Sequence, residues 1–144
     1  MIHEFRDDTR WLSNFASCEI KLGGFTFRSV ENAYMSLRND SVEWLQYCLN
    51  NPPAMVKRKS KQIKDDEGWD DRKIMAMKIC LEKKFVQEPF FSKLMATGNE
   101  NIQEGNLWTD DFWGIDLSIN PNKGENHLGR LIMEIRKKYK DGSN

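Results

Sequence analysis

The segment from Asp70 to Gln87 constrains the fold of this chain most strongly. Its apolar residues recur at intervals of three and four: Ile74, Met77, Leu81 and Phe85. This spacing places them on one face of an α-helix. Acidic residues begin the segment and lysines lie near its end, as the helix dipole favours. We therefore expect the central core helix here.

Further helix signals follow one another along the chain. Helices are expected to begin at Ser29, at a capping box formed by Asp40 and Glu43, at Pro52–Pro53, at Pro89 and at Asn126. Thr97–Gly98 ends the helix that Pro89 begins, because glycine commonly follows a helix end. The sequence thus predicts mainly helical structure.

Two segments lack helical spacing. Cys18–Phe27 alternates polar and apolar residues around Gly23–Gly24, which predicts a β-hairpin. Asn99–Glu125 has no helical period and is rich in Gly, Asn, Asp and Trp. A long segment without an obvious element is more often a functional loop than a passive connector.

Length and composition limit the class of protein. The chain has 144 residues, which suits one domain over residues 1–144 with an α+β fold, mainly helical with a small β-hairpin or sheet. Its net charge is zero, so any nucleic-acid contact must be local. The odd cysteine count and the absence of a long apolar run predict reduced thiols in a cytoplasmic protein with no membrane contact.

Several familiar signatures are absent. Gly124 and Gly129 are spaced like part of a phosphate-binding loop, but Arg130–Leu131 follows where Lys-Ser or Lys-Thr is required. Two histidines without characteristic spacing predict no metal site. The basic residues Lys57–Lys61 either contact phosphates or form a solvated helix face.

Several short motifs together resemble the NADAR superfamily, also called YbiA-like. They are Trp11-Leu12-Ser13-Asn14-Phe15, Phe27-Arg28-Ser29-Val30-Glu31-Asn32-Ala33-Tyr34, Ala96-Thr97-Gly98, Glu104, Asp111-Phe112-Trp113-Gly114 and Asn126-His127-Leu128-Gly129-Arg130. The resemblance implies a small, mainly helical α+β N-glycosidase that needs no cofactor. Known members either remove ADP-ribose from guanine in nucleic acid or cleave the ribosylamine of an early riboflavin-pathway intermediate.

The resemblance also implies roles for individual residues. The expected catalytic residues are Glu31, Lys57, Glu104 and Asp111. The expected substrate-binding residues are Ser13, Asn14, Phe15, Tyr34, Trp113, Gly114, Asn126, Leu128 and Gly129. The amides of Asn126–Gly129 could bind a phosphate, although Asn126 could instead simply cap the last helix.

Three residues depart from the family pattern. Asn32 replaces a histidine, and Ser60 and Lys61 replace a glycine and an arginine. These changes leave the glycosidase as the first hypothesis and prompt an alternative, a non-catalytic module that binds ADP-ribose or another NAD-derived nucleotide. A third reading is an interaction protein with exposed tryptophans as anchors: Trp44, Trp69 and Trp108.

Two chemical routes fit an amine-linked ribose. In the first, a neutral Lys57 forms a Schiff base with the opened sugar. In the second, carboxylates stabilise an oxocarbenium-like state and guide water. In either route Glu31 and Glu104 would transfer protons and Asp111 would orient the ribose. The expected partner is a ribosyl or ADP-ribosyl nucleobase, with local nucleic-acid contact through Lys57, Arg58, Lys59 and Lys61, and the protein is expected to be a monomer or weak oligomer.

Overall fold

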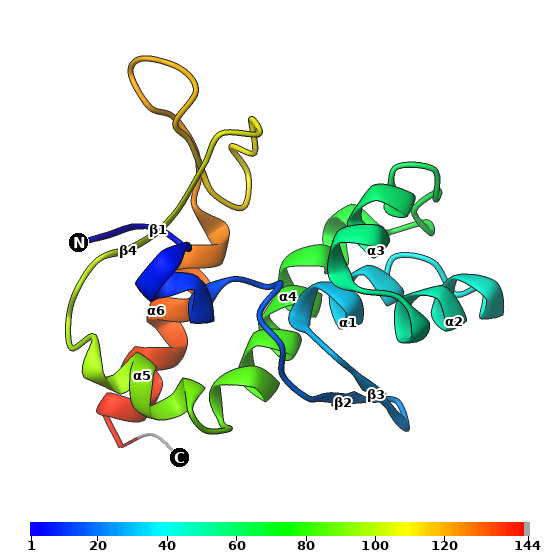
Figure 1. Cartoon of the computed structure of the whole chain (residues 1–144), viewed down its shortest axis with the longest axis horizontal. Coiled ribbons are helices and arrows are strands. Elements are labelled where there is room, and N and C mark those ends of the chain that lie inside the picture. Colours follow the sequence, from blue (N-terminus) through cyan, green and yellow to red (C-terminus); the bar gives the residue numbers. More distant parts are fainter. Residues whose placement is uncertain (143–144) are drawn as a thin grey trace. The chain divides into compact units, whose positions relative to one another are not determined.

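The computed structural model describes residues 1–142, which form two compact units. One unit combines Met1–Ser13 with the chain from Phe85 onward, and the other is Asn14–Lys84. Figure 1 shows the elements in chain order by colour. The predicted α+β fold, mainly helical with a small hairpin, is confirmed.

The Asn14–Lys84 unit begins with the predicted hairpin. Strands β2 (Ile20–Leu22) and β3 (Phe25–Phe27) pair antiparallel. Gly23 and Gly24 between them have φ angles of 58° and 84°, a backbone region that glycine enters without a steric penalty. The turn therefore explains why two glycines stand here.

Three helices follow the hairpin. Helix α1 (Val30–Ser36) is capped by Ser29, as expected. Helix α2 (Val42–Asn50) is capped by Ser41, whose Oγ accepts a hydrogen bond from the amide of Trp44 at 3.2 Å. The predicted capping box at Asp40 is therefore wrong by one residue. Helix α3 (Pro53–Ser60) begins at the proline pair.

The long helix α4 (Trp69–Phe85) confirms the strongest sequence prediction, although it ends two residues before Gln87. Met77 and Leu81 are buried, but Ile74 is 39% exposed. The buried face instead runs through Cys80, so one member of the predicted apolar stripe is wrong.

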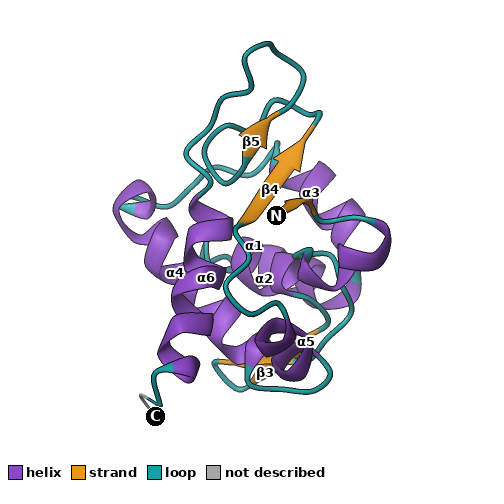
Figure 2. Cartoon of the chain, turned by 90° about the vertical axis from the view of Figure 1, so that its left-hand side faces the viewer, coloured by secondary structure: helices purple, strands orange, loops and turns teal. Residues whose placement is uncertain are grey.

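The other unit contains a parallel sheet in the order β1–β4–β5, drawn in orange in Figure 2. Its strands are β1 (Ile2–Glu4), β4 (Ile102–Asn106) and β5 (Ile115–Asp116). Two of them lie inside Asn99–Glu125, so the expectation that this segment lacks elements is wrong. Strand β4 carries a single large apolar side chain, too little for an alternating signal.

Helical elements complete this unit. They are the 3₁₀ helix η1 (Asp7–Leu12), α5 (Phe90–Ala96) and α6 (His127–Lys140). Helix α6 packs on β4 and buries the apolar residues Leu128, Leu131, Ile132 and Ile135. Within residues 1–142, no helix is both long and apolar enough to cross a membrane.

Candidate functional site

The predicted site residues fall into two groups, one in each unit. The Glu31 group lies in the Asn14–Lys84 unit and contains Asn14, Phe15, Glu31, Tyr34 and Lys57. The Glu104 group lies in the other unit and contains Ser13, Glu104, Asp111, Trp113, Gly114, Asn126, Leu128 and Gly129.

Glu31 is held at the start of α1. Ser29 ends the preceding extended chain and caps the helix, while the Glu31 amide donates to the Asn14 carbonyl at 3.0 Å. The Glu31 side chain is only 6% exposed, a rare condition for an acid. Burial raises the pKa of the Cys48 thiol to about 12, and the Glu31 carboxylate adds to this effect.

Asn14 presents a buried acceptor beside this helix. Its Nδ2 lies 3.6 Å from the sulfur of Met77. Its Oδ1 is buried and has no hydrogen-bond partner among the described residues. An unsatisfied buried carbonyl is costly, which makes Asn14 a candidate for ligand contact.

Phe15 and Lys57 are paired, whereas Tyr34 belongs to the core. The Lys57 ammonium lies 5.6 Å from the centroid of the Phe15 ring, an arrangement typical of cation–π contact. Tyr34 is 5% exposed and packs on Trp69 with ring centroids 5.3 Å apart. Its ring therefore contributes packing at this position.

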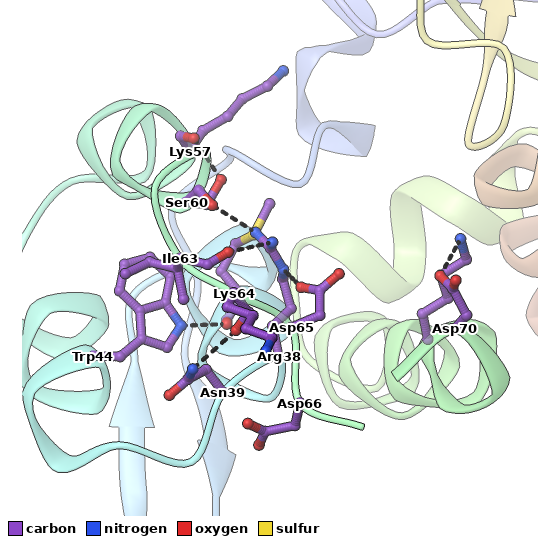
Figure 3. A network of polar contacts seen from close by, with 12 residues as sticks. Arg38, Asn39, Trp44, Lys57, Ser60, Ile63, Lys64, Asp65, Asp66 and Asp70 are labelled. Atoms are coloured by element: carbon purple, nitrogen blue, oxygen red, sulfur yellow. Dashed lines mark hydrogen bonds and ion pairs between the residues drawn. The ribbon is translucent and has the colours of Figure 1, made fainter. Parts of the chain in front are cut away.

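Arg38 fixes the turn that follows α3, a role that the sequence did not reveal. Its guanidinium contacts the Asp65 carboxylate at 2.6 Å and donates to the carbonyls of Ser60 and Ile63 at 3.3 Å each (Figure 3). The Lys57 side chain points away from this network (Figure 3). Arg38 and Asp65 are 27 residues apart, so no local pattern links them.

Two departures from the family pattern have structural roles here. Asn32 is fully buried, and its Nδ2 donates to the carbonyls of Cys48 and Asn51 at 2.7 Å each. Ser60 is also buried and donates to the carbonyl of Lys57 at 2.6 Å. Asn32 thus ties α1 to the end of α2, whereas the Ser60 bond lies within the last turn of α3.

Glu104 projects from β4 and is held by two asparagines. Its backbone amide donates to Asn126 Oδ1 at 3.0 Å, and its Oε2 accepts from Asn106 Nδ2 at 2.9 Å. Gly114 packs directly on it, because a Cβ at position 114 would collide with both the carboxylate and the carbonyl of Glu104. The sequence analysis missed Asn106.

Asp110, rather than Asp111, orders the loop after β4. The Asp110 carboxylate accepts from the amides of Phe112 and Trp113 at 3.1 and 2.9 Å. The Asp111 residue is exposed, and its carbonyl accepts from the amide of Glu125 at 2.7 Å. An Asp two residues before the amide that it binds is a recognised turn signal, which could have identified Asp110.

Aromatic rings gather beside this loop. Phe112 lies 4.9 Å from Trp113 and 4.4 Å from His127, measured between ring centroids. Trp113 is half-buried, so part of its surface stays open to solvent.

The start of α6 does not offer the amides expected to bind phosphate. The amides of Asn126, His127 and Leu128 donate to carbonyls of Gly114, Phe112 and Trp113 at 2.9 to 3.2 Å. The phosphate-binding expectation is therefore wrong for these three amides.

The side chain of Asn126 does not cap α6 either. It forms hydrogen bonds to β4 instead: Oδ1 accepts from the Glu104 amide, and Nδ2 donates to the Ile102 carbonyl. The backbone of Asn126 has a φ of 54°. Gly129 packs against the same Asn126 side chain, where a Cβ would collide. Asn126 and Gly129 thus hold the start of α6 against β4.

The remaining candidates have ordinary surroundings. Ser13 follows the last residue of η1, and its backbone amide donates a hydrogen bond to the Arg10 carbonyl. Trp44 and Trp69 are 3% and 4% exposed, so two of the three expected tryptophan anchors belong to the core, while Trp108 is 57% exposed. Among residues 1–142 no group of three or more His, Cys, Asp or Glu residues could hold a metal ion.

Comparisons with known proteins agree on one family. The NADAR domain family matches residues 2–140. The chain is 28% identical to a riboflavin biosynthesis protein of Vibrio vulnificus (strain YJ016), covering 91% of this chain but only 36% of that protein. It is also 28% identical to the N-glycosidase YbiA of Escherichia coli (strain K12), covering 90% of this chain and 81% of that one. The NMR structure of Escherichia coli YbiA matches 98% of this chain with a TM-score of 0.82 and 26% identity, and 84% of that chain is covered.

Proposed function

Because the chain belongs to the NADAR family, we propose that it is an N-glycosidase that hydrolyses the C–N bond between ribose and an exocyclic amine of a nucleobase. The similarity to a protein named N-glycosidase supports this activity. The substrate is either ADP-ribosylated guanine in nucleic acid or a ribosylaminopyrimidine intermediate of riboflavin synthesis. The name of the Vibrio relative supports the second choice.

The burial of Glu31 is the observation that carries the proposal. A carboxylate at a helix start that is only 6% exposed differs from an ordinary surface acid and is a suitable proton-transfer group. The neighbouring Asn14 has a buried oxygen that would accept a hydrogen bond from a sugar hydroxyl or a base amine. Together they supply a proton-transfer group and a polar contact for a ribosylated base.

Lys57 supports a Schiff-base route. Once the amine-linked sugar opens to an imine, the Lys57 amine adds to C1 and the base leaves with its own amine. Water then hydrolyses the lysine imine, releasing the sugar as an aldehyde and restoring the lysine. The half-buried position of Lys57 over Phe15 supports this role.

An oxocarbenium-like route uses the carboxylates instead. In this route Glu31 and Glu104 exchange protons with the substrate and water, and Asp111 orients the ribose. The half-buried Trp113 stacks on the base, a contact worth about 1 to 3 kcal/mol. Borohydride added during turnover distinguishes the routes, since only the lysine imine is reduced to a stable adduct on Lys57.

The basic run on α3 supports local contact with nucleic acid. Arg58, Lys59 and Lys61 are exposed, and Lys57 is half-buried beside them. We further propose a cytoplasmic protein, since its three cysteines are free thiols. A single domain and a monomeric or weakly associated state stay predictions.

Two substrates test the proposed activity. The purified protein is incubated with an oligonucleotide carrying ADP-ribosylated guanine and, separately, with the ribosylaminopyrimidine phosphate, and products are followed by mass spectrometry. Release of free sugar from one of them establishes the activity and names the substrate class. If both stay intact while ADP-ribose raises the melting temperature, the protein is the binding module and the proposal fails.

A further inference from the structure

We infer that Asn106 is a positioning residue for Glu104, holding one carboxylate oxygen so that the other points in a fixed direction. The inference rests on the proposed role of Glu104 in proton transfer. Asn106 ends β4 and is 1% exposed. A polar side chain this deeply buried needs a full set of hydrogen-bond partners.

The partners of Asn106 determine which way its amide points. Its Oδ1 accepts from the backbone amide of Asp110 at 3.0 Å. An NH₂ group cannot take that place, because two donors would face each other. Nδ2 must therefore face the other side, where it donates to Glu104 Oε2 at 2.9 Å and to the Asp110 carbonyl at 2.8 Å.

Strand geometry explains why the two side chains meet. Residues two apart on a strand point to the same face, and Glu104 and Asn106 have this spacing on β4. Gly114 closes the arrangement, because a Cβ there would collide with Glu104 Oε2 and lie 2.8 Å from Asn106 Nδ2. The Oε2 atom is thus held by a donor and a closely packed backbone.

The rest of Glu104 is anchored as well. Its backbone amide donates to Asn126 Oδ1 at 3.0 Å, so asparagine side chains fix both its main chain and its carboxylate. A neutral amide donor orients the carboxylate without adding charge. Precise placement of this kind contributes to rate, and a misplacement of about 1 Å can cost about 100-fold.

Asn106→Asp is the most informative substitution. It keeps the side-chain shape and the acceptor for the Asp110 amide, but it replaces the donor facing Glu104 with a carboxylate oxygen. Asn101→Asp is the matched control, since Asn101 is an exposed asparagine in the same unit. Steady-state rates are measured on whichever substrate the wild-type protein turns over, and melting temperatures are recorded for both variants.

We expect Asn106→Asp to lower kcat about 10- to 100-fold with KM unchanged, while the control keeps wild-type values. Equal kcat in both variants would overturn the positioning role. So would a rate loss expressed entirely in KM.

A second measurement needs no turnover and covers the case in which Asn106→Asp fails to fold. The side-chain NH₂ signals of Asn106 are compared by NMR in the wild-type protein and in Glu104→Gln. They should shift in the variant, and they should follow the acid titration of Glu104 in the wild-type protein. Signals that respond to neither change would overturn the inference. Absence of wild-type turnover would instead count against the proposed function. The NMR result would still show whether the Asn106 side chain contacts the Glu104 carboxylate.

Discussion

At the scale of single residues, the buried thiols make the free energy of unfolding depend on pH in the alkaline range. Burial raises the pKa of both Cys48 and Cys80 to about 12 from the ordinary value of 9.0. Between these values the folded protein holds protons that the unfolded chain releases, so the free energy of unfolding falls as pH rises through this window. Urea unfolding at pH 8 and at about pH 10.5 should show this loss.

Other groups also titrate at high pH, so a variant isolates the thiol. Cys80→Ala should show a smaller loss of stability between the two pH values than the wild-type protein, whatever its stability at pH 8. An unchanged loss would mean that the Cys80 thiol ionises normally in the folded state.

Asn32 illustrates a second effect at this scale. Asn32→Ala removes the donor to the Cys48 carbonyl, in a buried contact, and to the Asn51 carbonyl, in a part-buried one, and an unsatisfied buried group costs about 1 to 3 kcal/mol. We expect a destabilisation of at least about 2 kcal/mol in chemical denaturation. Asn50→Ala is the control because Asn50 is exposed on α2, and it should change stability little. Similar values for the two variants would contradict a structural role for Asn32.

At the scale of elements, the start of α2 gives a direct comparison. Ser41→Ala removes the hydroxyl that accepts from the Trp44 amide and should cost about 1 kcal/mol. Asp40→Ala should be close to neutral, because Asp40 is exposed and its backbone amide, which the substitution keeps, donates to the Asp66 carboxylate. Denaturation curves of the two variants test this, and a larger loss for Asp40→Ala would restore the sequence-based capping box.

The same scale shows what could be predicted from the sequence. Helix starts depend on nearby residues, so Ser29 and Pro53 identified α1 and α3 correctly. Strand β1 depends on pairing with β4, about a hundred residues away in the chain, in parallel register. Its three residues carry too little pattern of their own, so no local reading could find it.

The candidate site divides in a similar way. Short motifs pointed to Glu31 and Glu104 as acids, and the structure adds the groups that hold them. Asn106 and Arg38 act through contacts that depend on how a loop or a distant turn folds back. Residue type alone does not show such contacts, which is why the sequence analysis missed both.

At the scale of the whole molecule, zero net charge limits how strongly nucleic acid can be attracted. If Arg58, Lys59 and Lys61 each contact a phosphate, the slope of log affinity against log salt should be about −2 to −3 for an oligonucleotide. Replacing all three with glutamine should remove most of this slope in a binding titration.

A control with the same change in charge shows whether the contact is local. Lys137, Lys138 and Lys140 are exposed on α6, and replacing them with glutamine should leave the slope unchanged. Equal losses in the two triple variants would show that overall charge, rather than the α3 surface, governs binding.

The most direct test of the central claim is the single-turnover rate of sugar release by the wild-type protein, Glu31→Gln and Glu104→Gln on the substrate that the wild-type protein cleaves. Each substitution keeps the side-chain shape and removes the proton-transfer group, so we expect each to slow release by about 10² to 10⁴-fold while the variants still bind the substrate. Wild-type rates in both variants would contradict the assignment of these acids. No release by the wild-type protein from either substrate would contradict the glycosidase itself.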